Sequence, residues 1–126
     1  MDSIRNLVID MDGVLWHGET ALPGLNTFFD VLKERNFPFV LATNNAMKTA
    51  EDYVQKLGNF GVSVDAEQIL TSSEATASHL RRTYPNLGEV YAVGEAGLHR
   101  TLKTQGFDIV SPKAVRNGAR PEVVVT

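Results

Sequence analysis

Short apolar runs alternate with amphipathic stretches along the chain, and this alternation restricts the possible folds more than any other feature. Apolar runs at 7–9, 37–42 and 69–71 predict three strands. Buried parallel strands are apolar on both faces, so we expect the uninterrupted run at 7–9 to be a buried strand. Strands alternating with helices predict an α/β fold with a parallel sheet and right-handed crossovers.

Three amphipathic stretches between these runs predict helices. Residues 25–35 have apolar side chains at helical spacing and follow a glycine. A second helix is expected after Thr49, where acids fill the first turn. A third is expected to begin with Ser72 or Ser73 as its cap and to end near Arg82. The expected buried face of the second helix consists of Tyr53, Val54 and Leu57.

A cluster of turn-forming residues at 84–88 predicts a boundary between two parts of the chain. A second strand–helix–strand pattern follows it. We therefore expect one domain over 1–86 and the beginning of another over 87–126. The elements expected in the second part are strands at 90–93, 107–110 and from 123, and a helix at 96–105, with a polar stretch at 111–120.

Composition excludes several classes of protein. The chain has 126 residues, which is enough for one compact domain, and its net charge of −3 argues against nucleic acid as a partner. The absence of cysteine removes disulfides and thiol chemistry. No apolar stretch reaches the roughly 18 residues of a membrane span, and the N-terminus lacks the pattern of a signal peptide. We expect a cytoplasmic protein with no membrane partner.

Two carboxylates follow the first predicted strand. Asp10 comes directly after the apolar run, and Asp12 lies two residues further on. If Asp10 is buried, its charge costs several kcal/mol unless a cation or hydrogen-bond donors compensate. Magnesium is suited to this position, because it binds oxygen ligands and retains several waters.

The second predicted strand ends in Thr43, Asn44 and Asn45. Sequential parallel strands usually pair, so Thr43 is expected beside Asp10 at the same edge of the sheet. A hydroxyl and successive backbone N–H groups can bind a phosphate oxygen there. The sequence therefore predicts a phosphoryl-transfer site.

The motif Asp10-Met11-Asp12-Gly13-Val14-Leu15 resembles the first motif of haloacid dehalogenase (HAD) superfamily phosphatases, and Thr43-Asn44-Asn45 resembles the second. Trp16-His17-Gly18 and the segment 93–98 also resemble the NagD-like, p-nitrophenylphosphatase-type branch. The resemblance implies a Rossmann-like core with its first three strands present, followed by the first half of an α/β C2-type cap.

The resemblance also implies roles for the site residues. Asp10 would be the nucleophile that forms an aspartyl-phosphate, and Asp12 the general acid and then the general base. Both would bind Mg²⁺, Asp12 through its backbone carbonyl. Thr43 and the Asn44 amide would hold the phosphoryl group, and Asn45 would face the substrate. Met11, between the two acids, is counted with these phosphate- or substrate-binding residues.

Two further motifs of the resembled family are missing. The chain has no Gly-Asp pair, and its lysines do not match the context of the family's phosphate-clamping lysine. Among them, Lys56 is expected on a solvated helix face. We therefore expect the N-terminal portion of a longer protein, impaired as an enzyme, with an exposed apolar sheet edge that could pair with a second copy.

The leading hypothesis is a magnesium-dependent phosphatase of small phosphorylated metabolites. One alternative is a catalytically inactive fragment that only associates with partners. A receiver-type phosphoacceptor domain is less well supported, because the third predicted strand ends at Thr71 with no acid. Trp16 is expected to be a packing residue, while His17 could lie on the surface or approach the substrate.

Overall fold

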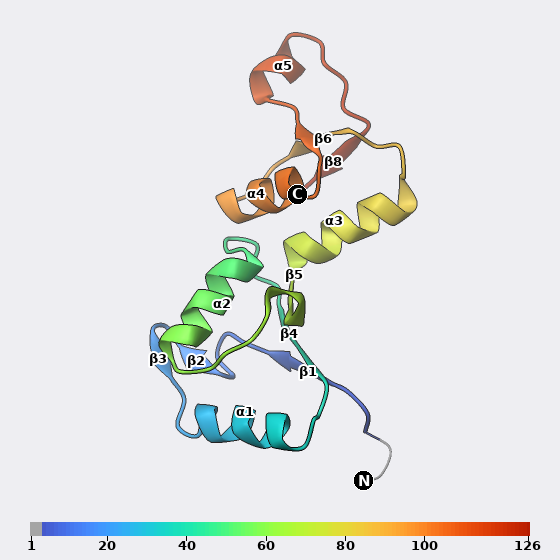
Figure 1. The fold of residues 1–126 in the computed structure, drawn as a ribbon. Helices are drawn as coiled ribbons and strands as arrows, with labels where there is room; N and C mark the ends of the chain where they lie inside the picture. Colours follow the sequence, from blue (N-terminus) through green and yellow to red (C-terminus); the bar gives the residue numbers. More distant parts are fainter. Residues whose placement is uncertain (1–3) are drawn as a thin grey trace. The chain divides into compact units, whose positions relative to one another are not determined.

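The computed structural model describes residues 4–126, which form two compact units (Figure 1). The first unit contains the residues up to 44 together with 50–70, and the second contains 45–49 and 71–126. The predicted domain boundary, with a core at 1–86 and a cap from 87, stays a prediction.

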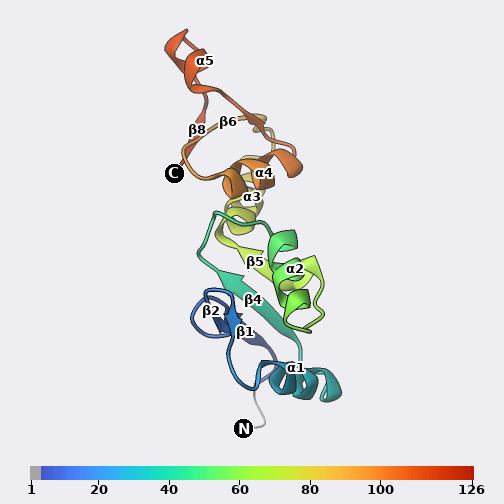
Figure 2. The same ribbon diagram turned by 90° about the vertical axis from the view of Figure 1, so that its left-hand side faces the viewer.

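The first unit is built on a three-stranded sheet with the order β1-β4-β5 (Figure 2). Its strands are β1 (Leu7–Asp10), β4 (Phe39–Thr43) and β5 (Ile69–Thr71). β1 and β4 are parallel, and their register places Asp10 beside Ala42. The predicted α/β fold with a parallel sheet is confirmed. This register also brings the residues that follow the two strands to one edge of the sheet.

Two helices of this unit pack against a shared apolar core. Helix α1 (Leu25–Glu34) and helix α2 (Ala50–Asn59) lie where the apolar spacing predicts them. A short 3-10 helix, η1 (Ala66–Gln68), precedes β5. Burying one apolar stripe of each helix against the sheet supplies the main favourable term for folding. The core includes Leu25, Phe29 and Leu32 of α1, Tyr53 and Leu57 of α2, and Phe39 and Leu41 of β4.

After β1 the chain forms a small hairpin, which the sequence did not predict. It pairs β2 (Trp16–His17) with β3 (Thr20–Ala21) in antiparallel orientation. Between β1 and this hairpin, the backbone N–H of Gly13 donates to the Trp16 carbonyl at 2.9 Å. The hairpin therefore returns the chain toward the two acids.

The expectation that β1 is buried on both faces is wrong. Leu7 and Ile9 are half-buried, but Val8 is 76% exposed. Among residues 4–126, β1 pairs with β4 alone, so it forms an edge of the sheet. The expected exposed apolar edge is thereby confirmed.

The second unit contains the predicted second strand–helix–strand pattern. Its three-stranded sheet has the order β7-β6-β8, and β6 is parallel to both neighbours. The helices of this unit include α3, which precedes the sheet in the sequence, and α4, which connects β6 to β7. The elements are α3 (Ser72–Thr83), β6 (Glu89–Ala92), α4 (Ala96–Thr104), β7 (Asp108–Ile109), α5 (Pro112–Arg116) and β8 (Val123–Val125).

Two local features of the second unit differ from the sequence predictions. The predicted cap of α3, Ser72 or Ser73, is wrong. The cap is Thr71, whose hydroxyl accepts a hydrogen bond from the Glu74 N–H at 3.0 Å. Within the polar stretch at 111–120, Ser111 caps the short helix α5 and Pro112 occupies its first turn. Across residues 4–126, no helix combines the length and apolar character needed to cross a bilayer.

Candidate active site

Asp10 is the last residue of β1, and its side chain is exposed. Its Oδ1 accepts a hydrogen bond from the backbone N–H of Met11 at 2.9 Å. The expectation of a buried Asp10 is wrong, because β1 is an edge strand and Asp10 is its terminal residue. Because Asp10 is exposed, burial gives no reason to expect a cation beside its carboxylate. Met11 is fully buried, and its predicted role in binding phosphate or substrate stays a prediction.

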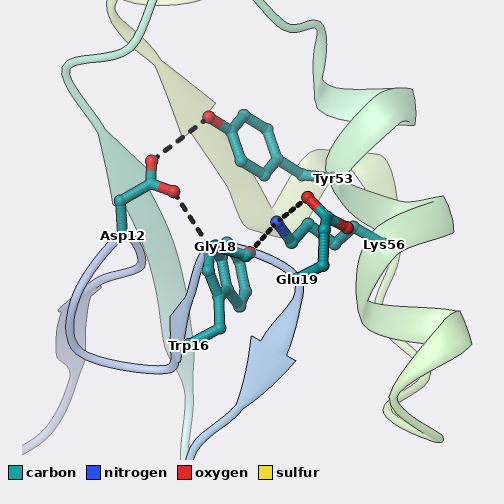
Figure 3. Close-up of polar contacts among 6 residues, drawn as sticks. All are labelled: Asp12, Trp16, Gly18, Glu19, Tyr53 and Lys56. Carbon is teal, nitrogen blue, oxygen red and sulfur yellow. Dashed lines mark hydrogen bonds and ion pairs between the residues drawn. The ribbon is translucent and has the colours of Figure 1, made fainter.

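Asp12 lies between β1 and the hairpin, and both of its carboxylate oxygens contact neighbouring side chains. Its Oδ1 accepts a hydrogen bond from the indole N–H of Trp16 at 2.9 Å. Its Oδ2 lies 3.4 Å from the Thr43 hydroxyl and 3.4 Å from the Tyr53 hydroxyl. Figure 3 shows the contacts with Trp16 and Tyr53. Asp12 therefore joins residues from β4, α2 and the hairpin.

The residues that follow β4 lie in different surroundings. Thr43 ends the strand and is buried, with its hydroxyl directed to Asp12. Asn44 is exposed. Asn45 is half-buried and belongs to the second unit, where its Oδ1 accepts a hydrogen bond from the Met47 N–H at 2.9 Å. The structure thus brings the Thr43 hydroxyl to Asp12, whereas the Asn45 side chain bonds to the backbone of its own turn. The proposed roles of these residues stay predictions.

The Tyr53 hydroxyl also belongs to this cluster, although the sequence predicts only a packing role for Tyr53. Burial raises the pKa of its phenol above the ordinary value of 10.0. A hydrogen bond with Thr43 acts in the opposite direction, while the charge of Asp12 adds to the rise. The phenol is therefore uncharged near neutral pH and can either donate or accept a hydrogen bond. A buried tyrosine usually has a hydrogen-bond partner for its hydroxyl. The predicted burial of Tyr53 was therefore the feature of the sequence that pointed to such a contact.

Lys56 is buried, with 9% of its surface exposed, and the expectation that it lies on a solvated helix face is wrong. Its ammonium group donates to the Gly18 carbonyl at 2.6 Å and to Glu19 at 3.0 Å, as Figure 3 shows. The nitrogen also lies 5.0 Å from the centre of the Trp16 ring. The hairpin covers this part of α2, which helical periodicity alone cannot reveal. Trp16, at 1% exposure, is confirmed as a packing residue.

The donor set fits a hard divalent cation in its chemistry. Asp10 offers a carboxylate oxygen and Asp12 a backbone carbonyl oxygen, and Mg²⁺ in proteins is often held by one or two carboxylates while retaining several waters. Within residues 4–126, no group of three or more acidic, histidine or cysteine side chains gathers around a common point. The described residues thus fit an open site with few protein ligands rather than a closed protein cage.

These features define a class: an α/β protein with one acid at the carboxyl end of β1, a second acid just beyond it, and a threonine at the end of the neighbouring strand. In parallel α/β sheets, ligands bind at this edge. A family model described as haloacid dehalogenase-like hydrolase matches residues 7–108. The chain belongs to this family.

Individual relatives agree with this assignment. The chain is 36% identical over 107 residues to the ribonucleotide monophosphatase NagD of Escherichia coli strain K12, and 33% identical over 108 residues to the chloroplastic phosphoglycolate phosphatase 1A of Arabidopsis thaliana. These matches cover 85% of this chain in each case, but 42% and 30% of the relatives. A solved 4-nitrophenylphosphatase of Thermotoga maritima superposes with a TM-score of 0.84 at 33% identity, covering 98% of this chain and 44% of that protein. The chain therefore spans less than half the length of these relatives.

Proposed function

We propose that this chain carries the nucleophile and the acid–base group of a magnesium-dependent phosphatase that hydrolyses small phosphomonoesters through an aspartyl-phosphate. The observation that carries the proposal is the approach of Asp12 to the Thr43 hydroxyl at 3.4 Å. It joins the ends of two paired parallel strands, β1 and β4, at the edge where α/β proteins bind ligands.

The relatives support this class of substrate. NagD is named as a ribonucleotide monophosphatase, and the Arabidopsis protein as a phosphoglycolate phosphatase. Their named substrates differ in the alcohol but share the phosphate monoester. We therefore extend to this chain only the phosphomonoester, and not one particular alcohol.

Each residue has a definite part in the proposed reaction. A carboxylate oxygen of Asp10 attacks phosphorus, and the bond from phosphorus to the alcohol oxygen breaks. Asp12 gives its proton to that leaving oxygen. Water then attacks phosphorus and gives a proton to Asp12, while the bond from phosphorus to Asp10 breaks and inorganic phosphate leaves. Such proton transfer raises the rate about 10²–10⁴-fold. The Thr43 hydroxyl and the Asn44 N–H hold phosphoryl oxygens. A bound Mg²⁺ would supply positive charge to the phosphoryl group.

The 126 residues contain no Gly-Asp pair, and none of their lysines matches the context of the phosphate-clamping lysine of the resembled family. We therefore expect the rate of these residues alone to be low. The alternative is that they are catalytically inactive and only associate with another chain. The exposed apolar edge at β1 favours that alternative, and activity measurements separate the two.

The test is Mg²⁺-dependent hydrolysis of p-nitrophenyl phosphate by the wild-type chain and by two acid-to-amide variants. We expect slow turnover that requires Mg²⁺, is lost in Asp10→Asn and is unchanged in Asp30→Asn. Asp30 is an exposed acid on α1 and serves as the matched control. Turnover that survives Asp10→Asn would contradict the proposal, and the absence of turnover in the wild-type chain would favour the inactive alternative.

A further inference from the structure

The two oxygens of Asp12 are held unequally. Oδ1 accepts the Trp16 indole N–H at 2.9 Å, which is within the usual range for such a bond. Oδ2 has the Thr43 and Tyr53 hydroxyls at 3.4 Å, longer than the usual range for hydroxyl hydrogen bonds. One oxygen is therefore fixed, while the other has only loose contacts (Figure 3).

The indole that holds Oδ1 is itself fixed by its surroundings. Trp16 is fully enclosed, and its ring stacks on Tyr53 with the centroids 6.2 Å apart and the planes 24° apart. Phe60 packs on it at 5.9 Å. The Lys56 ammonium lies over the ring and is anchored to the hairpin through Gly18 and Glu19. A cation over an indole face is attractive, so this contact favours the observed ring orientation.

We propose that Trp16 is the positioning residue for Asp12, and that it leaves Oδ2 as the oxygen that exchanges protons with the substrate. An indole N–H can only donate, so Oδ1 must remain an acceptor for as long as this bond persists. The proton of neutral Asp12 therefore resides on Oδ2. This inference rests on the proposed function, because it refines the acid–base role of Asp12 in that reaction.

The proton transfers then follow from the geometry. In the first half, the Oδ2–H bond breaks, its electron pair stays on Oδ2, and the proton moves to the leaving alcohol oxygen. In the second half, Oδ2 takes a proton from the attacking water as the water oxygen bonds to phosphorus, the bond from phosphorus to Asp10 breaks and phosphate leaves. Oδ1 keeps the Trp16 hydrogen bond throughout, so the carboxyl group does not rotate between the two steps. Misplacing such a group by about 1 Å can lower the rate by about 10²-fold.

The spectroscopic test uses the fact that Trp16 is the only tryptophan of the chain. Its indole N–H gives one signal in a ¹H–¹⁵N spectrum of the wild-type chain, and this readout does not require turnover. We expect Asp12→Ala to move that signal upfield, toward the position of an indole without an acceptor, and Asp10→Ala to leave it in place. An unmoved signal in Asp12→Ala, or an equal shift in Asp10→Ala, would overturn the proposed hydrogen bond.

The kinetic test compares substrates that differ in how much they need a proton. A p-nitrophenolate leaves readily without protonation, whereas an alkoxide does not. In a first-turnover measurement, we expect Trp16→Phe to slow release of the alcohol from an alkyl phosphate about 10–100-fold, and release of p-nitrophenol much less. Equal slowing of both would assign Trp16 a purely structural role and overturn the proposal. Tyr84→Phe, at an exposed aromatic residue, is the control and should alter neither rate.

The two tests separate this proposal from the proposed function. A wild-type chain without turnover would count against the phosphatase, while the shift of the indole signal in Asp12→Ala would still support the positioning of Asp12. Turnover with an unmoved indole signal would keep the phosphatase and reject Trp16 as the positioning residue.

Discussion

At the scale of single residues, the polar cluster around Asp12 depends on side chains that the sequence presents as packing residues or, for Lys56, as a solvated one. Tyr53 and Lys56 both lie on α2, and Trp16 lies on the hairpin. Each places an apolar body in the core and directs a polar atom to a specific partner. The cluster therefore links the stability of the first unit to the geometry of its candidate active site.

Lys56→Met tests this link, because methionine keeps much of the apolar stem and removes the charge. The variant loses hydrogen bonds to Gly18 and Glu19 and the contact with the Trp16 ring. We expect the free energy of unfolding to fall by about 1–2 kcal/mol in urea denaturation. Lys33→Met, at an exposed position of α1, should change it by less than about 0.5 kcal/mol.

The ion pair itself contributes little to that loss. Glu19 is 85% exposed, so its attraction to Lys56 is screened by water. Glu19→Gln should therefore cost no more than about 1 kcal/mol. If Lys56→Met proved no more costly than Lys33→Met, the buried ammonium would have no structural role.

At the scale of elements, the sequence predicted what periodicity determines and missed what tertiary contacts determine. The apolar spacing of α1 and the uninterrupted run of β4 placed both elements within about two residues. The hairpin at 16–21 was missed because its two-residue strands are too short to show a period. Lys56 was misplaced for a related reason, since the hairpin that covers it was not anticipated.

For the candidate site too, the sequence predicted the positions along the strands and missed the tertiary contacts. The sequence placed Asp10, Asp12 and Thr43 at the ends of neighbouring strands, and the register of β1 and β4 agrees with that arrangement. It could not give the contacts of Asp12 with Trp16 and Tyr53, because these depend on how the hairpin and α2 pack. The burial of Asp10 was predicted wrongly, because the chain supplies only one neighbouring strand for β1 among the described residues.

Packing of α4 provides a prediction within the second unit. A Cβ added at Gly97 would overlap the backbone of Ala46 and Met47, which cannot move aside as a side chain could. We expect Gly97→Ala to lower the free energy of unfolding by about 1–3 kcal/mol, measured by urea denaturation followed by circular dichroism.

The matched control is Gly58→Ala, since Gly58 lies in α2 with open space around it. Alanine is the better helix former, so this variant should be neutral or more stable by up to about 1 kcal/mol. Equal effects of the two substitutions would show that α4 does not pack closely on the segment 45–49.

At the scale of the whole molecule, the edge strand β1 carries Val8, the most exposed large apolar side chain among residues 4–126. Val8 is 76% exposed on this strand, and Val14 and Phe28 contribute exposed apolar surface to a hollow beside it. Strand edges with apolar side chains pair readily with other chains. We propose that this edge mediates association between copies of the 126-residue chain.

Sedimentation velocity over a range of concentrations tests this proposal. We expect the wild-type chain to associate as its concentration rises, and Val8→Lys to remain monomeric, because an edge lysine opposes pairing. Val31→Lys adds the same charge on α1 and should associate like the wild-type chain. A wild-type chain that stays monomeric throughout, or equal behaviour of the two variants, would exclude β1 as the contact.

The most direct test of the central claim is whether Asp10 accepts a phosphoryl group. Beryllofluoride mimics a phosphoryl group on a carboxylate, and its adduct can be observed by ¹⁹F nuclear magnetic resonance. With Mg²⁺ present, we predict a bound beryllofluoride signal in the wild-type chain and in Asp30→Asn, and its loss in Asp10→Asn. No bound signal in the wild-type chain, or a signal that persists in Asp10→Asn, would contradict the assignment of Asp10 as the nucleophile.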